Sequence, residues 1–194
     1  MTSRSPLSPG KPVAPPTMRA SIRVAASVVG HSTRLRAANA VARAVLRLVG
    51  ASRAVVFLDP AAIRALEVLP PPPVRHPDTL IVAASAGRPS LHVGATHGLV
   101  GSLMAEAVRQ KRLVLSTGHS RRSRVLEAIA TPWPGLSDAV AVPLVHARRT
   151  IGVLVAGHDT STGTGRVFRQ ALSDFAPVAA VGLVAASRYE EAQR

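Results

Sequence analysis

A chain of 194 residues is long enough for one domain with a sizeable core, and 47% of its residues are hydrophobic although only 3% are aromatic. The sequence contains no cysteine, which excludes disulfide scaffolds, cysteine-ligated zinc and thiolate nucleophiles. The formal net charge is +14. The absence of cysteine fits a cytoplasmic protein, and no uninterrupted apolar run is long enough to span a membrane.

The N-terminal part of the chain is basic and rich in proline and serine. Residues 1–50 contain eight Lys or Arg and no acid, because the first carboxylate is Asp59. We expect residues 1–30 to form a flexible extension and residues 31–194 to form the folded domain. A positive field attracts nucleic acid, anionic lipid or acidic proteins, although an arginine-rich composition also arises without selection for binding.

The first regular element is predicted to be a helix. Apolar residues recur at steps of three and four from Leu35 to Val49, which places them on one helical face. Ser32 is its predicted N-cap, and Gly50 is predicted to end it in a left-handed conformation.

Short strands and helices are predicted to alternate through the middle of the chain. β-branched and apolar runs indicate the strands, while capping residues and glycines indicate where helices begin. The expected elements are a strand at 54–58, a short helix opened by Asp59-Pro60, a strand at 80–85, a turn at 97–101 leading into a helix through Val108, a strand at 113–116 and a helix at 120–130.

The last third of the sequence predicts a hairpin and a long helix. Residues 139–145 and 151–156 are apolar runs joined by a five-residue, mostly polar connection, which is short enough for an antiparallel pair. Helical spacing then begins at Phe168 and continues to the charged end. Pro177 lies inside this pattern and is expected to kink or restart the helix.

This order of elements indicates an α+β fold. We expect one central antiparallel sheet with the N- and C-terminal helices packed together on one face. Three stretches, taken in order, resemble the GAF domain family: a glycine-flanked turn with a helix and a strand, a hairpin, and a closing helix. They are Gly98–Gly101 with Lys111–Leu115, Ser137–Leu144 with Ile151–Leu154, and Leu172–Glu191.

The resemblance implies a sensory or regulatory module that binds a small ligand or a partner protein in signal transduction. The Asn-Lys-Phe-Asp-Glu signature of cyclic-nucleotide-binding relatives is absent. The cysteines that serve bilin-binding and methionine-sulfoxide-reducing relatives are absent too. No Gly-x-Ser-x-Gly elbow occurs either, so we expect no enzymatic activity or catalytic residue, and the sequence assigns no cofactor.

Candidate ligand contacts lie where the family closes over its pocket. Arg121 and Arg122 belong to the densest basic cluster of the folded part and would meet an anionic ligand, with Trp133 as a stacking wall. His97 and His119 complete the candidate set. The alternative, which we favour for the arginines and the tryptophan, is a solvated helix face and a core-covering side chain. No histidine spacing indicates a metal site.

The apolar terminal helices and the basic N-terminal arm suggest two kinds of binding partner. The terminal helices carry more apolar residues than one sheet face readily covers, so we expect a homodimer through them, testable by Val45→Asp. A second reading is a nucleic-acid-associated protein that uses its basic N-terminal arm. The sequence lacks interleaved aromatics and a helix-turn-helix pattern, so we expect such binding to be weak.

Overall fold

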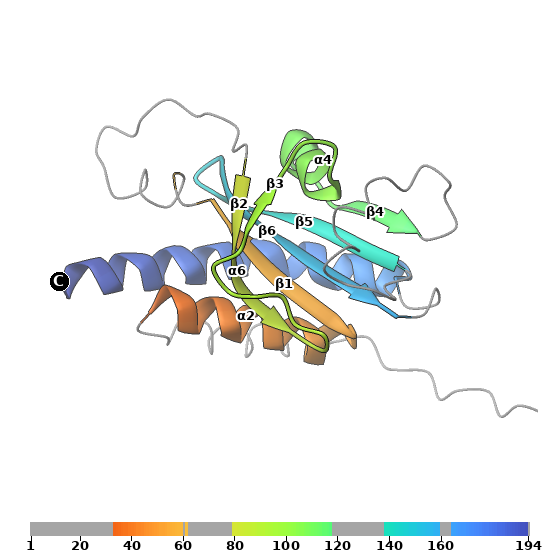
Figure 1. The fold of residues 1–194 in the computed structure, drawn as a ribbon, viewed down its shortest axis with the longest axis horizontal. Helices are drawn as coiled ribbons and strands as arrows, with labels where there is room; N and C mark the ends of the chain where they lie inside the picture. The colour runs from red at the N-terminus through yellow and green to blue at the C-terminus, as the bar shows by residue number, and fades with distance from the viewer. Residues whose placement is uncertain (1–32, 60, 62–78, 118–137, 160–163, 194) are drawn as a thin grey trace, which may run out of the picture.

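The computed structural model describes residues 33–59, 61, 79–117, 138–159 and 164–193. Within them, two long helices lie side by side against one face of a six-stranded sheet, and a short helix lies against the other face (Figure 1). The elements are α2 (Arg34–Val49), β1 (Arg53–Leu58), β2 (Thr79–Ala86), β3 (Thr96–Gly98), α4 (Leu103–Gln110), β4 (Val114–Thr117), β5 (Asp138–His146), β6 (Arg149–His158) and α6 (Arg166–Ala192).

The sheet has the strand order β3-β2-β1-β6-β5-β4, and all its pairs are antiparallel. The β5–β6 hairpin turns through Ala147 and Arg148, whose φ angles are 47° and 65°. Two residues with positive φ give the turn that matches strand twist. The predicted five-residue connection is therefore too long, because β5 continues to His146 and β6 begins at Arg149.

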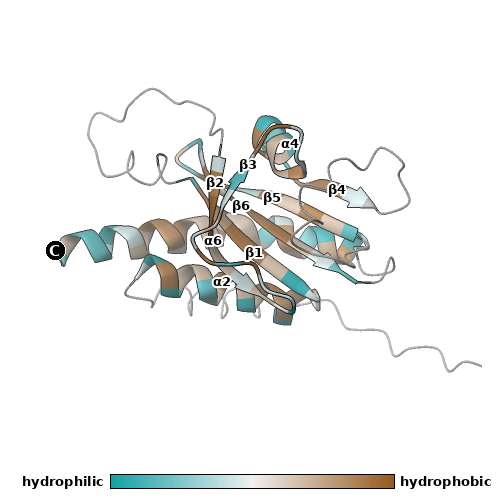
Figure 2. Cartoon of the chain, in the orientation of Figure 1, coloured by the Kyte–Doolittle hydropathy of each residue, from teal (hydrophilic) through white to brown (hydrophobic). Residues whose placement is uncertain are grey.

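Helices α2 and α6 close one sheet face, here called the helix-pair face. It carries Ala54, Val56 and Leu58 of β1 with Leu154 and Ala156 of β6. Both helices turn small or branched apolar side chains toward these strands and toward each other, so aliphatic residues build most of this core, as the composition requires. The apolar stripes are visible as brown bands on both helices (Figure 2).

Helix α6 is continuous from Arg166 to Ala192 and contains Pro177, so the predicted restart is wrong. Proline costs a helix about 3 kcal/mol. The buried side chains of Phe175, Ala176 and Ala179 on either side of the proline hold the helix against the sheet and offset this cost. Among the described helices, α6 is long and apolar enough to cross a membrane, but 61% of its apolar window is buried, which makes it a core helix.

The predicted α+β architecture is confirmed, including the sheet and the paired terminal helices. One detail is corrected: Thr33, not Ser32, caps α2, and its hydroxyl accepts the Arg36 N–H at 3.3 Å. Gly50 ends α2 with a φ of 67°, as predicted. The extension 1–30, most of the short helix after Asp59, and the helix at 120–130 fall outside the described residues and stay predictions.

Candidate functional site

The sheet face opposite α2 and α6, here called the α4 face, is lined by apolar side chains. Because successive strand residues point to opposite faces, these side chains alternate with those of the helix-pair face. Helix α4 and the segments around Leu91 and Leu99 cover them. The strand residues are Val55 and Phe57 of β1, Leu80 and Val82 of β2, Ala139 and Ala141 of β5, and Val153 and Val155 of β6.

Helix α4 is anchored at its N-cap residue, Ser102. The buried Ser102 hydroxyl accepts the Ala105 N–H at 3.1 Å and donates to the Leu99 carbonyl at 2.7 Å. The helix buries Leu103, Met104, Ala107 and Val108 against the sheet, and it ends at Lys111 in a left-handed conformation. A cap that is bonded on both sides fixes where this short helix begins over β4, β5 and β6.

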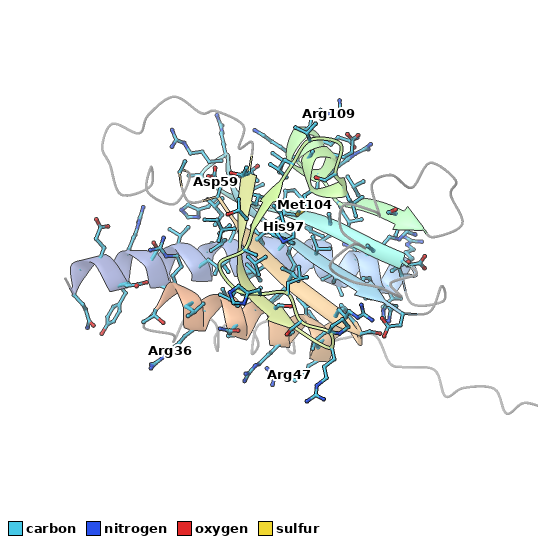
Figure 3. The ribbon with its side chains drawn as sticks, in the orientation of Figure 1. Arg36, Arg47, Asp59, His97, Met104 and Arg109 are labelled. Carbon is cyan, nitrogen blue, oxygen red and sulfur yellow. The ribbon has the colours of Figure 1, made fainter. Side chains whose placement is uncertain are left out.

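His97 brings a polar group to the α4 face. It lies on β3 opposite Leu80, and its ring centroid is 5.4 Å from that of Phe57 in an edge-on arrangement. Burial lowers the pKa of His97, so the imidazole is neutral at pH 7. A neutral imidazole offers one hydrogen-bond donor and one acceptor. Figure 3 labels His97 together with Met104 of α4.

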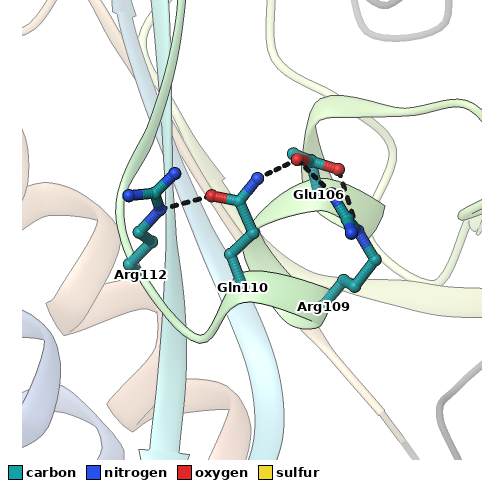
Figure 4. A network of polar contacts seen from close by, with 4 residues as sticks. All are labelled: Glu106, Arg109, Gln110 and Arg112. Atoms are coloured by element: carbon teal, nitrogen blue, oxygen red, sulfur yellow. Dashed lines mark hydrogen bonds and ion pairs between the residues drawn. The ribbon is translucent and has the colours of Figure 1, made fainter.

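Helix α4 and the residues that follow it carry a network of polar side chains (Figure 4). Both Nε and Nη2 of Arg109 donate to the Glu106 carboxylate, at 3.2 and 2.6 Å, and this contact raises the Arg109 pKa. Gln110 donates to Glu106 and accepts from Arg112. Both oxygens of the Glu106 carboxylate thus accept hydrogen bonds from side chains of the same helix.

An arginine is buried at one end of the α4 face. The side chain of Arg53 is 6% exposed, and its Nη2 lies 2.9 Å from an oxygen of Asp159. Gly87 packs against it, since a Cβ at that glycine would come within 3.2 Å of the Arg53 Cγ. The half-exposed carboxylate of Asp159 neutralises this buried cation. Sequence analysis missed the pair, which only the β1–β6 register brings together.

A second polar cluster lies at the same end of the sheet on the helix-pair face. Asp138 and His158 are cross-strand partners, and Thr164 donates its hydroxyl to Asp138 at 3.1 Å. Burial lowers the His158 pKa, while the charges of Asp138 and Asp159 act in the opposite direction. The His158 ring also packs on Phe168 with centroids 4.9 Å apart. The cluster ties the hairpin to the start of α6.

Of the predicted ligand contacts, the structure describes His97 and places it on the α4 face. His119, Arg121, Arg122 and Trp133 lie outside the described residues. Within the part of the chain that the structure describes, no group of three or more His, Asp or Glu residues could hold a metal ion.

The described residues form an antiparallel sheet with two paired helices on one face and a small covering helix on the other, an α+β architecture. The model of one family, the GAF domain, matches residues 32–184, and the chain belongs to this family. GAF domains are small-molecule-binding regulatory modules. No curated protein sequence matches the chain.

Solved structures share the fold at low sequence identity. The GAF domain of an Acinetobacter phosphoenolpyruvate-protein phosphotransferase superposes with a TM-score of 0.66 and 14% identity, over 86% of this chain and 91% of that one. The free methionine-R-sulfoxide reductase of Neisseria meningitidis, solved with its substrate, gives 0.64 and 14%, over 90% of each chain. The chromophore-binding domain of an R. palustris bacteriophytochrome gives 0.63 and 13%, over 91% of this chain and 62% of that one.

Proposed function

We propose that this chain is a regulatory module that binds a small ligand on the α4 face and relays its binding to a signalling partner. The observation that carries the proposal is His97, a neutral, partly buried imidazole edge-on to Phe57 beside an apolar cluster. A few polar groups on an apolar wall are what fixes a ligand's orientation in small-molecule sites. The proposal keeps His119, Arg121, Arg122 and Trp133 as further contacts from the segment 118–137.

We propose a regulatory and not an enzymatic role. A relative with this fold is a sulfoxide reductase. This chain has no cysteine at any position, so it cannot carry out the thiol chemistry associated with sulfoxide-reducing relatives. A cysteine-free chain also suits the cytoplasm, where we propose that it works.

A thermal-unfolding screen tests ligand binding. A panel of cyclic nucleotides, amino acids and aromatic acids is tested, because a ligand that binds only the folded state raises the unfolding temperature. Any compound that stabilises the wild type is expected to lose its effect in His97→Gln. His92→Gln, at an exposed loop histidine, is the matched control. A panel without effect, or hits that His97→Gln leaves unchanged, would contradict the proposal.

We further propose a homodimer through the terminal helices, with α6 as the main contact. Val45 is fully buried in the monomer, so Val45→Asp would test folding instead of association. Val167, Val181 and Tyr189 of α6 are each at least 50% exposed and available for contact. Sedimentation should show a dimer that Val181→Asp dissociates and that Val93→Asp, at a partly exposed loop valine, leaves intact. A wild-type monomer at all concentrations would reject the dimer.

A further inference from the structure

Helix α2 carries a straight row of arginines on its solvent side. Arg36, Arg43 and Arg47 are exposed and lie seven and four residues apart. At about 100° per residue they fall within about 40° of one another around the helix axis. The buried residues of α2, such as Ala38, Val41 and Val45, lie on the opposite side. Arg36 and Arg47 accordingly point away from the body of the protein (Figure 3).

The row lacks the carboxylate partners that three other described arginines have. Arg34 lies beside Glu190, Arg53 beside Asp159, and Arg109 beside Glu106. Within the described residues no ion pair involves Arg36, Arg43 or Arg47. Helix α2 contains no acid, and residues 1–32, which precede it, contain four Lys or Arg and no Asp or Glu. Uncompensated positive charge therefore accumulates on the outer side of α2.

The shape of the row favours a linear polyanion. At 1.5 Å per residue the arginines extend over about 16 Å, a length of DNA duplex that carries about ten phosphate charges. A membrane-binding helix would insert its apolar face into the lipid. The apolar face of α2 is buried against the sheet and α6 and cannot do so.

We propose that the outer face of α2, defined by Arg36, Arg43 and Arg47, binds the sugar–phosphate backbone of nucleic acid. Among the described residues no exposed aromatic side chain lies on α2, so the row has no base-stacking group. The guanidinium groups contact phosphates, which carry no sequence information. Binding is thus independent of base sequence and steeply dependent on salt. This surface is separate from the α4 face, so a ligand-bound regulator and its nucleic acid would occupy different sides of the domain.

The test compares two triple variants that lose the same charge. Arg36→Gln/Arg43→Gln/Arg47→Gln removes the row, while Arg166→Gln/Arg169→Gln/Arg188→Gln removes three exposed arginines of α6. Both keep long side chains of good helix propensity. Binding of the full chain to a labelled random-sequence DNA duplex is measured over a range of salt concentrations, and circular dichroism verifies that each variant is folded.

At about 50 mM salt the α2 variant is expected to bind about a thousandfold more weakly than the wild type, and its log–log salt slope should fall by about 2.7, or about 0.9 for each lost phosphate contact. The α6 variant should keep most of the wild-type slope. Absence of DNA binding by the wild type, or equal losses in both variants, would overturn the proposal. Tighter, α2-dependent binding to phosphatidylserine–phosphatidylcholine vesicles would overturn it in favour of a membrane partner.

Discussion

The two faces of the sheet are covered in different ways. On the helix-pair face, α2 and α6 supply 16 and 27 residues of helix and interlock with each other as well as with the strands. On the α4 face, the described helical cover is the 8-residue α4, over β4, β5 and β6. A face closed by two mutually supporting helices is suited to hold the fold together, whereas a short helix such as α4 can rearrange locally. The proposed ligand contact, His97, lies on the second.

A pair of leucines tests this difference most strongly. Leu172 on α6 and Leu103 on α4 are 0% and 3% exposed, so both lose a buried side chain on mutation to alanine. Such substitutions cost about 2 to 5 kcal/mol, and the cost falls where the surroundings can collapse into the cavity. We expect Leu172→Ala near the upper end and Leu103→Ala near the lower end, measured by urea unfolding. An equal or larger loss for Leu103→Ala would contradict the distinction between the faces.

A pair of glycines compares the centre of the sheet with its edge, because β6 lies inside the sheet and β3 at one edge. A Cβ at Gly152 of β6 would collide with the Phe57 carbonyl oxygen and lie 3.0 Å from the Leu58 Cδ2. Gly152→Ala must therefore push β1 and β6 apart, at a cost of about 3 kcal/mol. Gly98 of β3 has open space at the same position, so Gly98→Ala should stay within about 0.5 kcal/mol of wild type. Equal stabilities of the two variants would show that β1 and β6 can move apart at little cost in free energy.

The helix caps provide a smaller comparison. Ser102 of α4 is buried with hydrogen bonds on both sides, whereas Thr33 of α2 accepts one bond of 3.3 Å at the surface. Cap removal costs about 0.5 to 2 kcal/mol. Ser102→Ala is expected near the upper end and Thr33→Ala near the lower end in chemical unfolding. A reversed order would mean that α4 depends little on its cap.

Each face also carries a histidine whose pKa is lowered by burial, His97 on the α4 face and His158 on the helix-pair face. The folded state favours both neutral imidazoles, so the stability they contribute is complete above about pH 6.5 and lost as the pH falls below it. Unfolding at about pH 7.5 and about pH 5.5 should show weakening in acid that His97→Gln or His158→Gln reduces. A pH dependence unchanged in both variants would exclude these groups as its source.

The two histidines differ in their surroundings. Asp138 and Asp159 raise the pKa of His158 against the effect of burial, whereas burial alone acts on His97. Asp138→Asn should therefore lower the His158 pKa further and leave that of His97 unchanged in an NMR titration. Equal shifts of both histidines would indicate a change in the whole fold.

Sequence periodicity predicts the elements that bury a long apolar face. Helix α2, the β5–β6 hairpin and α6 follow from such patterns, and the structure confirms them. Strand β3 has the sequence Thr-His-Gly, which carries no strand pattern, and it forms because β2 offers it a partner. The turn at Ala147-Arg148 lacks the Asn or Gly that usually mark such a turn.

The candidate site is less accessible to sequence reasoning than the fold. His97 is among the ligand contacts predicted from the sequence, and it is the one of them that lies within the described residues. Arg53 and Asp159 belong to distant segments, and only the pairing of β1 with β6 brings them together. Local patterns contain no information on such contacts, because register is set by the whole sheet.

The strand order also bears on how the chain is made. β1 lies in the centre of the sheet between β2 and β6, yet about 90 residues separate it from β6. During synthesis β1 can pair with β2 early, but its other edge stays open until the ribosome has released β6. That edge has the sequence Arg-Ala-Val-Val-Phe-Leu, and an open, apolar edge is a template for aggregation. A nascent chain stalled before Arg149 therefore exposes one edge of a strand that is central and buried in the finished sheet.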